Sequence, residues 1–173
     1  EVPKGTAVMR SGAKVGDVVG LTNYVGYAAT GLGALSYNLV GYDMTKVGHQ
    51  RPEPQIELGQ KLRLLGIHSM NDISDGLGSE LNEIAAASNV SIVIEEQAIP
   101  LHEETYALAK HLQTNPVDYA LYGGEDFQLV FTAPKSLLSE LEKLAGITLI
   151  NTVFIAFDEI IKQNKIVFHA NRK

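Results

Sequence analysis

Apolar residues spaced three or four positions apart predict helices in several parts of the chain. One stripe predicts a helix over residues 76–88 and consists of Leu77, Leu81, Ile84 and Ala85. An earlier helix, which Gly66 should end, carries Leu58, Leu62 and Leu65. Further helices are expected over residues 103–112 and in the segment that contains Leu137, Leu138, Leu141 and Leu144. A glycine-rich segment near the N-terminus is expected to form a helix that runs to about Leu39.

Short apolar runs bounded by turn residues predict strands between these helices. They are expected over residues 18–22, 67–73, 90–96 and 127–132. The C-terminal part suggests one more strand and then a hairpin that turns near Gln163 and Asn164, whereas the polar residues 41–54 are expected to form a loop. Strands and helices therefore alternate, which predicts an α+β domain with a mixed β-sheet covered by helices.

Composition and charge narrow the class of protein. The chain has 173 residues, 45% of them hydrophobic and 20% charged, which is typical of a single globular domain. A net charge of -6 argues against a broad affinity for nucleic acid, and no apolar run is long enough to cross a membrane. The absence of cysteine excludes disulfides and fits a cytoplasmic protein. Because the chain opens with Glu1, we expect it to be a fragment of something longer.

The first candidate site is the segment Asp72-Ile73-Ser74-Asp75-Gly76, between a predicted strand and a predicted helix. Unpaired N–H groups at the start of a helix attract phosphate, and Mg²⁺ prefers carboxylates together with phosphates and water. Asp72 and Asp75 could supply such carboxylates, and Ser74 could donate to a phosphate oxygen. The simpler alternative is that Ser74 or Asp75 only caps the helix. Capping leaves Asp72 unexplained.

The second candidate is Gly123-Gly124-Glu125-Asp126, in front of a predicted buried strand. Two glycines permit a sharp turn, and the adjacent carboxylates repel each other unless a cation or a cationic substrate is present. An exposed turn without function is an equally good interpretation of these residues alone.

Other sequence patterns give weaker evidence of a functional site. The segment with Gly26, Gly31 and Gly33 lacks the Gly-Lys-Ser/Thr of a phosphate loop, so close helix packing is the better interpretation. The histidines have no zinc-ligand spacing, and no serine lies in the context of a hydrolase nucleophile.

Taken together, the motifs resemble one family, the thiamine-monophosphate kinases. The segments "MRSGAKVGD", "GYAATGL", "HQRPEP", "MNDISDGLGSELNEIA" and "LYGGEDFQLVFTAP" occur in the order found in that family, and the similarity runs from about Met9 to Pro134. The family belongs to the ATP-dependent superfamily of aminoimidazole ribonucleotide synthetase. This chain resembles only the C-terminal domain of a two-domain enzyme, over residues 1–173. The resemblance implies that an N-terminal domain, which would carry most of the ATP and magnesium site and form a homodimer, is missing.

The resemblance implies roles for individual residues. Asp72 and Asp75 would bind Mg²⁺, Ser74 would contact ATP, and Glu125 with Asp126 beside it would face thiamine monophosphate. The implied reaction transfers the γ-phosphoryl group of ATP to thiamine monophosphate and gives thiamine diphosphate, with the fragment alone inactive. Such a transfer depends on alignment and on charge neutralisation.

Two departures from the family pattern stand out. The C-terminal "VFHANRK" does not match the glycine-aromatic stretch that helps to hold the thiamine ring, so Phe168 is a poor equivalent. Asn23 and Tyr24 replace a Thr-Gly start and put the local loop shape in question. The alternatives are a paralogous synthetase or maturation protein with another acceptor, and a non-catalytic interaction domain.

Overall fold

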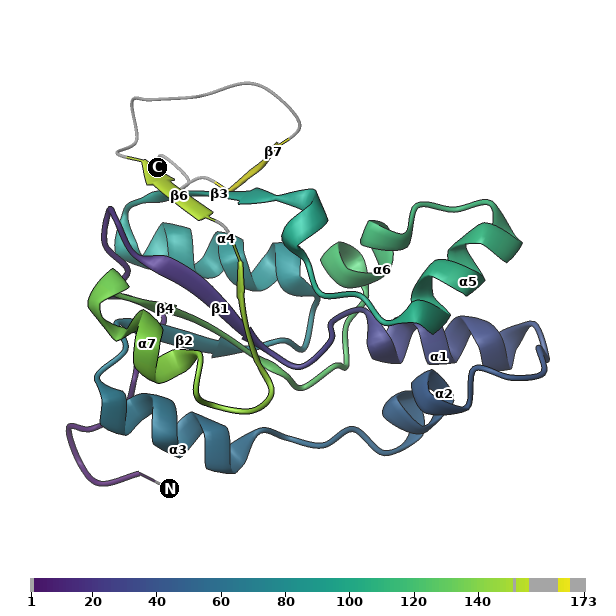
Figure 1. Cartoon of the computed structure of the whole chain (residues 1–173), viewed down its shortest axis with the longest axis horizontal. Coiled ribbons are helices and arrows are strands. Elements are labelled where there is room, and N and C mark those ends of the chain that lie inside the picture. The colour runs from purple at the N-terminus through teal and green to yellow at the C-terminus, as the bar shows by residue number, and fades with distance from the viewer. Residues whose placement is uncertain (1, 151, 156–164, 169–173) are drawn as a thin grey trace.

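The computed structural model describes residues 2–150, 152–155 and 165–168. Its central element is a four-stranded sheet in the order β2-β4-β1-β5, and a three-stranded sheet in the order β6-β3-β7 lies beside it (Figure 1). The strands of the first sheet are β1 (Val18–Thr22), β2 (Ser69–Asp72), β4 (Leu129–Ala133) and β5 (Ile147–Ile150). The second sheet contains β3 (Ser91–Glu95), β6 (Thr152–Ile155) and β7 (Lys165–Phe168).

Helices cover both faces of the four-stranded sheet. The helix α4 (Leu77–Ser88) lies between the two sheets, because its apolar stripe meets β1 and β3 in one buried cluster. The opposite face packs against α3 (Ile56–Leu65) and the short α7 (Leu138–Leu141), whose Leu62 and Leu141 surround Phe131 of β4. Side chains alternate along β1, so that Val19 and Leu21 enter one cluster and Val18 packs against the other.

A group of helices extends from one end of the sheets (Figure 1). It contains α1 (Tyr27–Ser36), α2 (Asp43–Gln50), α5 (Glu103–Leu112) and α6 (Pro116–Tyr122). The connecting 3₁₀ turns are η1 (Glu96–Ala98) and η2 (Lys135–Leu137). In the part of the chain that the structure describes, no helix combines the length and hydropathy needed to cross a bilayer.

The α+β class and most predicted elements are confirmed, and the sheet needs a correction in detail. Each strand pair in the described residues is antiparallel, and the strands form two sheets instead of one mixed sheet. The predicted C-terminal hairpin is wrong, because β3 lies between β6 and β7. Its turn near Gln163 and Asn164 lies outside the described residues. The helix expected to run to Leu39 ends at Ser36.

Two helices were not predicted from the sequence. Residues 43–50 were expected to form a loop, but they form the helix α2. The N-terminus of this helix is capped by a residue of a distant helix. Glu104 accepts hydrogen bonds from Thr45 N (2.8 Å) and Met44 N (3.3 Å). The helix α6 begins with Asn115 as its cap and Pro116 at its first position, a local signal that was available in the sequence.

Close packing of α1 against α2 explains a glycine in α1. A β-carbon at Gly31 would clash with the backbone of Thr45, which is buried in α2. The expectation that the small residues of α1 serve helix packing is therefore confirmed.

Gly31→Ala should lower the free energy of unfolding by about 1–3 kcal/mol, although alanine favours a helix by about 1 kcal/mol, because the two backbones would have to separate. Denaturant unfolding measures the effect. The matched control is Gly59→Ala in α3, where the new β-carbon would meet only the ends of two flexible side chains, Leu129 at 3.2 Å and Met70 at 3.9 Å. Equal stability of both variants would contradict the packing argument.

Candidate functional site

The segment 72–76 joins the end of β2 to the start of α4. Asp72 is the last residue of β2, and Gly76 takes the N-cap position of α4 with φ 96°. Asp72 and Asp75 are exposed, whereas Ile73 between them is fully buried. The buried isoleucine anchors the turn, so both carboxylates face solvent from one short, fixed segment.

Backbone hydrogen bonds bring the second acidic motif to the first. Ile73 N donates to Gln128 O (2.8 Å), and Phe127 N donates to Ile73 O (2.9 Å). Glu125 N then donates to Ser74 O (2.9 Å). These bonds extend the β2–β4 pairing beyond its last registered pair, so the two motifs form one continuous site.

Glycines allow this close approach. A β-carbon at Gly124 would clash with the carbonyl oxygen of Ser74, and one at Gly76 would lie 2.6 Å from the carbonyl oxygen of Leu121. Neither position therefore has room for a side chain. Glu125 and Phe127 have positive φ values of 69° and 50°, a costly conformation for residues with side chains that often marks functional segments.

A buried carboxylate on α4 holds the turn at residues 72–76 in place. Glu80 of α4 is 3% exposed, accepts a hydrogen bond from Asp75 N (3.3 Å) and another from Asn71 Nδ2. Burial raises the pKa of Glu80, the bond from Asp75 N opposes the rise, and the nearby carboxylates of Glu83, Asp72 and Asp75 raise it further. The turn is therefore a region of concentrated negative charge.

One arginine partly offsets this charge from the side. Arg10 Nε donates to Asn71 Oδ1 (3.0 Å) and forms a salt bridge with Glu83 (3.0 Å). Within the described residues, by contrast, the carboxylates of Asp72 and Asp75 accept no hydrogen bond and form no ion pair. Two exposed, unpaired carboxylates beside a buried one fit a divalent cation.

The described residues alone do not complete a metal site. No three histidine, aspartate or glutamate side chains in that part of the chain are placed to hold a metal ion together. Mg²⁺ is commonly held by one or two carboxylates plus substrate phosphates and water, so Asp72 and Asp75 remain suitable ligands.

Asp126 has a different environment from its neighbour Glu125, which is exposed. The Asp126 carboxylate is 4% exposed and accepts hydrogen bonds from Gly26 N (2.5 Å) and Ala28 N (2.8 Å). It therefore caps α1, which has no cap from its own N-cap side chain. Burial raises the pKa of Asp126 to about 6, against the opposing hydrogen bonds from Ala28, Gly26 and Tyr27. A direct contact with substrate, as the resemblance implies, stays a prediction.

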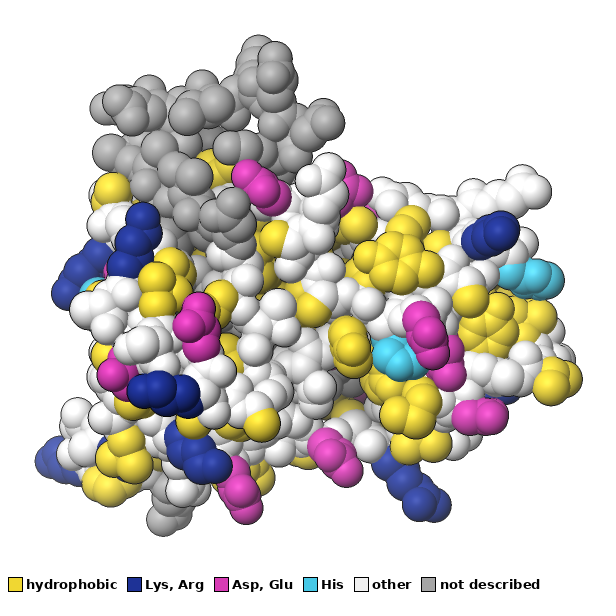
Figure 2. Space-filling view, in the orientation of Figure 1, with side chains coloured by type: hydrophobic (Ala, Val, Ile, Leu, Met, Phe, Trp, Pro, Cys, Tyr) yellow, Lys and Arg dark blue, Asp and Glu magenta, His cyan; other side chains and the backbone are white. Residues whose placement is uncertain are grey.

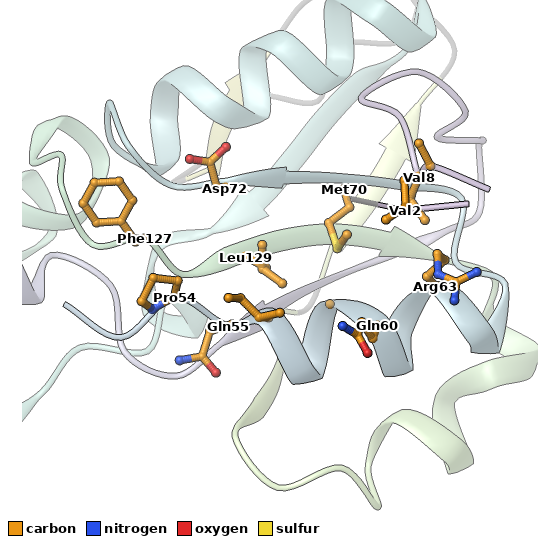
Figure 3. Close-up of a pocket in the computed structure, with 13 residues that line it drawn as sticks. Val2, Val8, Pro54, Gln55, Gln60, Arg63, Met70, Asp72, Phe127 and Leu129 are labelled. Carbon is orange, nitrogen blue, oxygen red and sulfur yellow. The ribbon is translucent and has the colours of Figure 1, made fainter. Parts of the chain in front are cut away.

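Two pockets flank the segment 126–129. The first, of about 470 Å³, lies between α3 and β2. Figure 3 shows Asp72 and Phe127 at one end of it and Arg63 at the other, with Met70 and Leu129 between them. The second, of about 340 Å³, has Asp126 and Gln128 in its wall. Alternate residues of the segment thus face opposite pockets.

The comparison with known proteins gives the family. The family described as AIR synthase related protein, C-terminal domain, matches residues 14–148 of the chain. The chain belongs to this family.

Curated relatives of this AIR synthase related domain are longer proteins. Thiamine-monophosphate kinase of Bacillus subtilis (strain 168) is 43% identical over 138 residues, which cover 76% of this chain and 41% of that protein. Thiamine-monophosphate kinase of Escherichia coli (strain K12) is 39% identical over 151 residues, which cover 84% and 45%. The chain thus spans less than half the length of these relatives.

Solved structures show the same fold. Thiamine-monophosphate kinase from Stenotrophomonas maltophilia K279a superposes with a TM-score of 0.80 at 29% identity, covering 88% of this chain and 52% of that one. AaThiL complexed with AMPPCP and TMP gives 0.74 at 33% identity, covering 84% and 47%. Hydrogenase maturation protein HypE in complex with ATP gives 0.70 at 21% identity, covering 91% and 48%, a likeness of fold alone.

Several residues of this family member were not singled out from its sequence. Glu80 was only part of the quoted helix motif, although an acidic residue on an apolar helix stripe is a signal of a buried carboxylate. The rings of Tyr24, Tyr27 and His102 also lie in contact, with centroids 5.2 to 6.3 Å apart. The sequence singled out Tyr24 only as a departure from the family pattern, and nothing local indicated this contact with His102. Asn23 adopts φ 54°, which asparagine tolerates, so the loop has a left-handed backbone conformation at that position.

The raised pKa of Asp126 predicts a pH dependence of stability. Because the folded-state pKa of about 6 exceeds the ordinary value of 3.8, this carboxyl stabilises the fold below its unfolded-state pKa. The contribution is lost as the pH rises through about 6. Asp126→Asn should remove about 1 kcal/mol of the difference in unfolding free energy between pH 5 and pH 7. Denaturant unfolding at both pH values tests this, with Asp118→Asn, an exposed aspartate of α6, as the control. An unchanged difference would contradict the assignment.

Proposed function

We propose that the full-length protein that contains this domain transfers the γ-phosphoryl group of ATP to the phosphate of thiamine monophosphate and forms thiamine diphosphate. The observation that carries the proposal is the junction of the two acidic motifs, because Glu125 N bonds to Ser74 O and places Glu125 beside the Asp72–Asp75 turn. The identity to thiamine-monophosphate kinases supports the same reaction. The solved AaThiL complex, which holds AMPPCP and TMP, supports both substrates.

The residues of this chain would have different roles in the reaction. Asp72 and Asp75 would hold Mg²⁺, which supplies charge neutralisation for the phosphates. Ser74, half-buried at the centre of the turn, would donate a hydrogen bond to an ATP oxygen. The rigid turn would fix the phosphates in line, and such alignment is the main requirement of phosphoryl transfer. Glu125 would meet the acceptor, whose thiazolium ring is a permanent cation, and Asp126 would hold this loop against α1.

Further features belong to the same proposal and follow from the family resemblance. They are dependence on Mg²⁺, a homodimer formed through an N-terminal domain, a cytoplasmic location, and no nucleic-acid or membrane partner.

The experiment that tests the function is formation of thiamine diphosphate from ATP and thiamine monophosphate by the full-length protein. Transfer to a different acceptor alone would favour a paralogous synthetase or maturation protein, and no transfer would favour an interaction domain.

Asp72→Asn in the full-length protein should lower the turnover rate by roughly two orders of magnitude or more, because an electrostatic contact to the transferring phosphates is lost. The unfolding free energy should change by less than about 1 kcal/mol, since removing one of several adjacent carboxylates also relieves repulsion. Asp118→Asn is the matched control. Unchanged turnover at saturating Mg²⁺ would show that Asp72 is not a ligand.

Glu125→Gln should weaken the apparent affinity for thiamine monophosphate about 10- to 100-fold, the value of one charge-assisted hydrogen bond. The apparent affinity for ATP should hardly change. Steady-state kinetics with each substrate varied in turn measure both, and Glu57→Gln, at an exposed position of α3, is the control. An equal loss for both substrates would place Glu125 in the metal–phosphate cluster.

A further inference from the structure

The side chain of Asn71 joins β2 to two other parts of the chain. Its Oδ1 accepts a hydrogen bond from Arg10 Nε (3.0 Å), in the segment before β1. Its Nδ2 donates to carboxylate oxygens of Glu80 and, at 3.1 Å, of Glu83, which lie three residues apart on one face of α4. Asn71 is 7% exposed, so both polar atoms of its amide are used inside the structure.

This network leads directly to the acidic turn. The two carboxylate oxygens of Glu80 have different partners, because Oε2 accepts from Asn71 and Oε1 accepts from Asp75 N (3.3 Å). Asp72 follows Asn71 directly, as the last residue of β2. The side chain of Asn71 therefore constrains both ends of the turn, one through the chain and the other through Glu80.

The charge of the network explains why an amide is needed at position 71. Glu80 is buried, and Glu83 lies close to it with a side chain that is 44% exposed. Two carboxylates that face one position repel each other unless a donor lies between them, and the Nδ2 group supplies this donor without adding charge. On the face that Figure 2 shows, charged side chains of the described residues lie singly or in small groups at the surface, where water solvates them. Glu80 depends instead on its partners in the protein.

We propose that Asn71 is a positioning residue for the phosphoryl transfer and fixes the metal-binding turn by presenting its amide group to Glu80. The inference rests on the proposed function, because it names a residue that acts on that reaction through the turn. Asn71 itself does not touch the substrates or the metal ion. It sets the geometry of the carboxylates, and phosphoryl transfer depends on such alignment.

An exchange of the two side-chain types in the full-length protein tests the pair. Asn71→Asp places a carboxylate against Glu80. Glu80→Gln leaves a single acceptor oxygen for two donors, Asn71 Nδ2 and Asp75 N. In the double variant the new glutamine can accept from Asp75 N and donate to the new aspartate, so both bonds return with the number of negative charges unchanged.

Each single variant should lower kcat about 10- to 100-fold and raise the half-saturating Mg²⁺ concentration by a similar factor. The double variant should recover to within about 5-fold of the unmodified protein. The KM for thiamine monophosphate should stay within about 2-fold in all three. The control is Ser69→Ala, which removes a buried hydrogen bond to Thr132 (2.8 Å) from the same strand and should leave these three quantities unchanged.

Hydrogen–deuterium exchange without metal or nucleotide measures the turn independently of the reaction. Peptides that span residues 73–77 should exchange about 10-fold faster in each single variant and return toward the unmodified rate in the double variant. Circular dichroism melting shows whether each variant is folded, and if Asn71→Asp does not fold, Glu80→Gln and the double variant still carry the test.

The outcomes separate this inference from the proposed function. If the protein forms thiamine diphosphate but the single variants keep the unmodified kcat and Mg²⁺ dependence, the positioning role is wrong and the proposed function stands. Single variants that lose activity without recovery in the folded double variant would also overturn the role of the pair. If the unmodified protein forms no thiamine diphosphate, both fail.

Discussion

The site depends on three backbone hydrogen bonds that extend the sheet past the end of β2. They join Ile73 to Gln128 and Phe127, and Ser74 to Glu125. Without them the two acidic segments, some fifty residues apart in sequence, would be independent loops. The same bonds require that no side chain intervene, which explains the glycine at position 124. Glu125 and Phe127, which donate two of the bonds, both have positive φ.

The carboxylates at this junction fall into two groups, one exposed and one buried. Asp72 and Asp75 stay exposed and unpaired in the described part of the chain, while Glu80 is buried beneath them and holds the turn through Asp75 N. Asp126, only one residue from exposed Glu125, is committed to capping α1. The exposed carboxylates can therefore meet ligands, and the buried ones keep them in place. Alternation along residues 126–129 gives each side of the segment its own pocket.

Much of this was predictable where the signal is local. The apolar stripe of α4 and the glycine that ends α3 identified their helices, and the acidic turn was placed correctly between a strand and a helix. The start of α2 is capped by Glu104 from a distant helix, so its own sequence carried little signal. The order of β6, β3 and β7 depends on long-range pairing, which short patterns do not encode. The contact among Tyr24, Tyr27 and His102 required the fold.

The most direct test of the account is the position of metal ions in a crystal of the full-length protein with Mn²⁺ in place of Mg²⁺, a non-hydrolysable ATP analogue and thiamine monophosphate. The account predicts an anomalous Mn²⁺ peak within ligand distance of Asp72 or Asp75, bridged to phosphate oxygens, with the acceptor beside Glu125. Manganese and both substrates bound elsewhere, with the Asp72–Asp75 turn contacting only water, would contradict it.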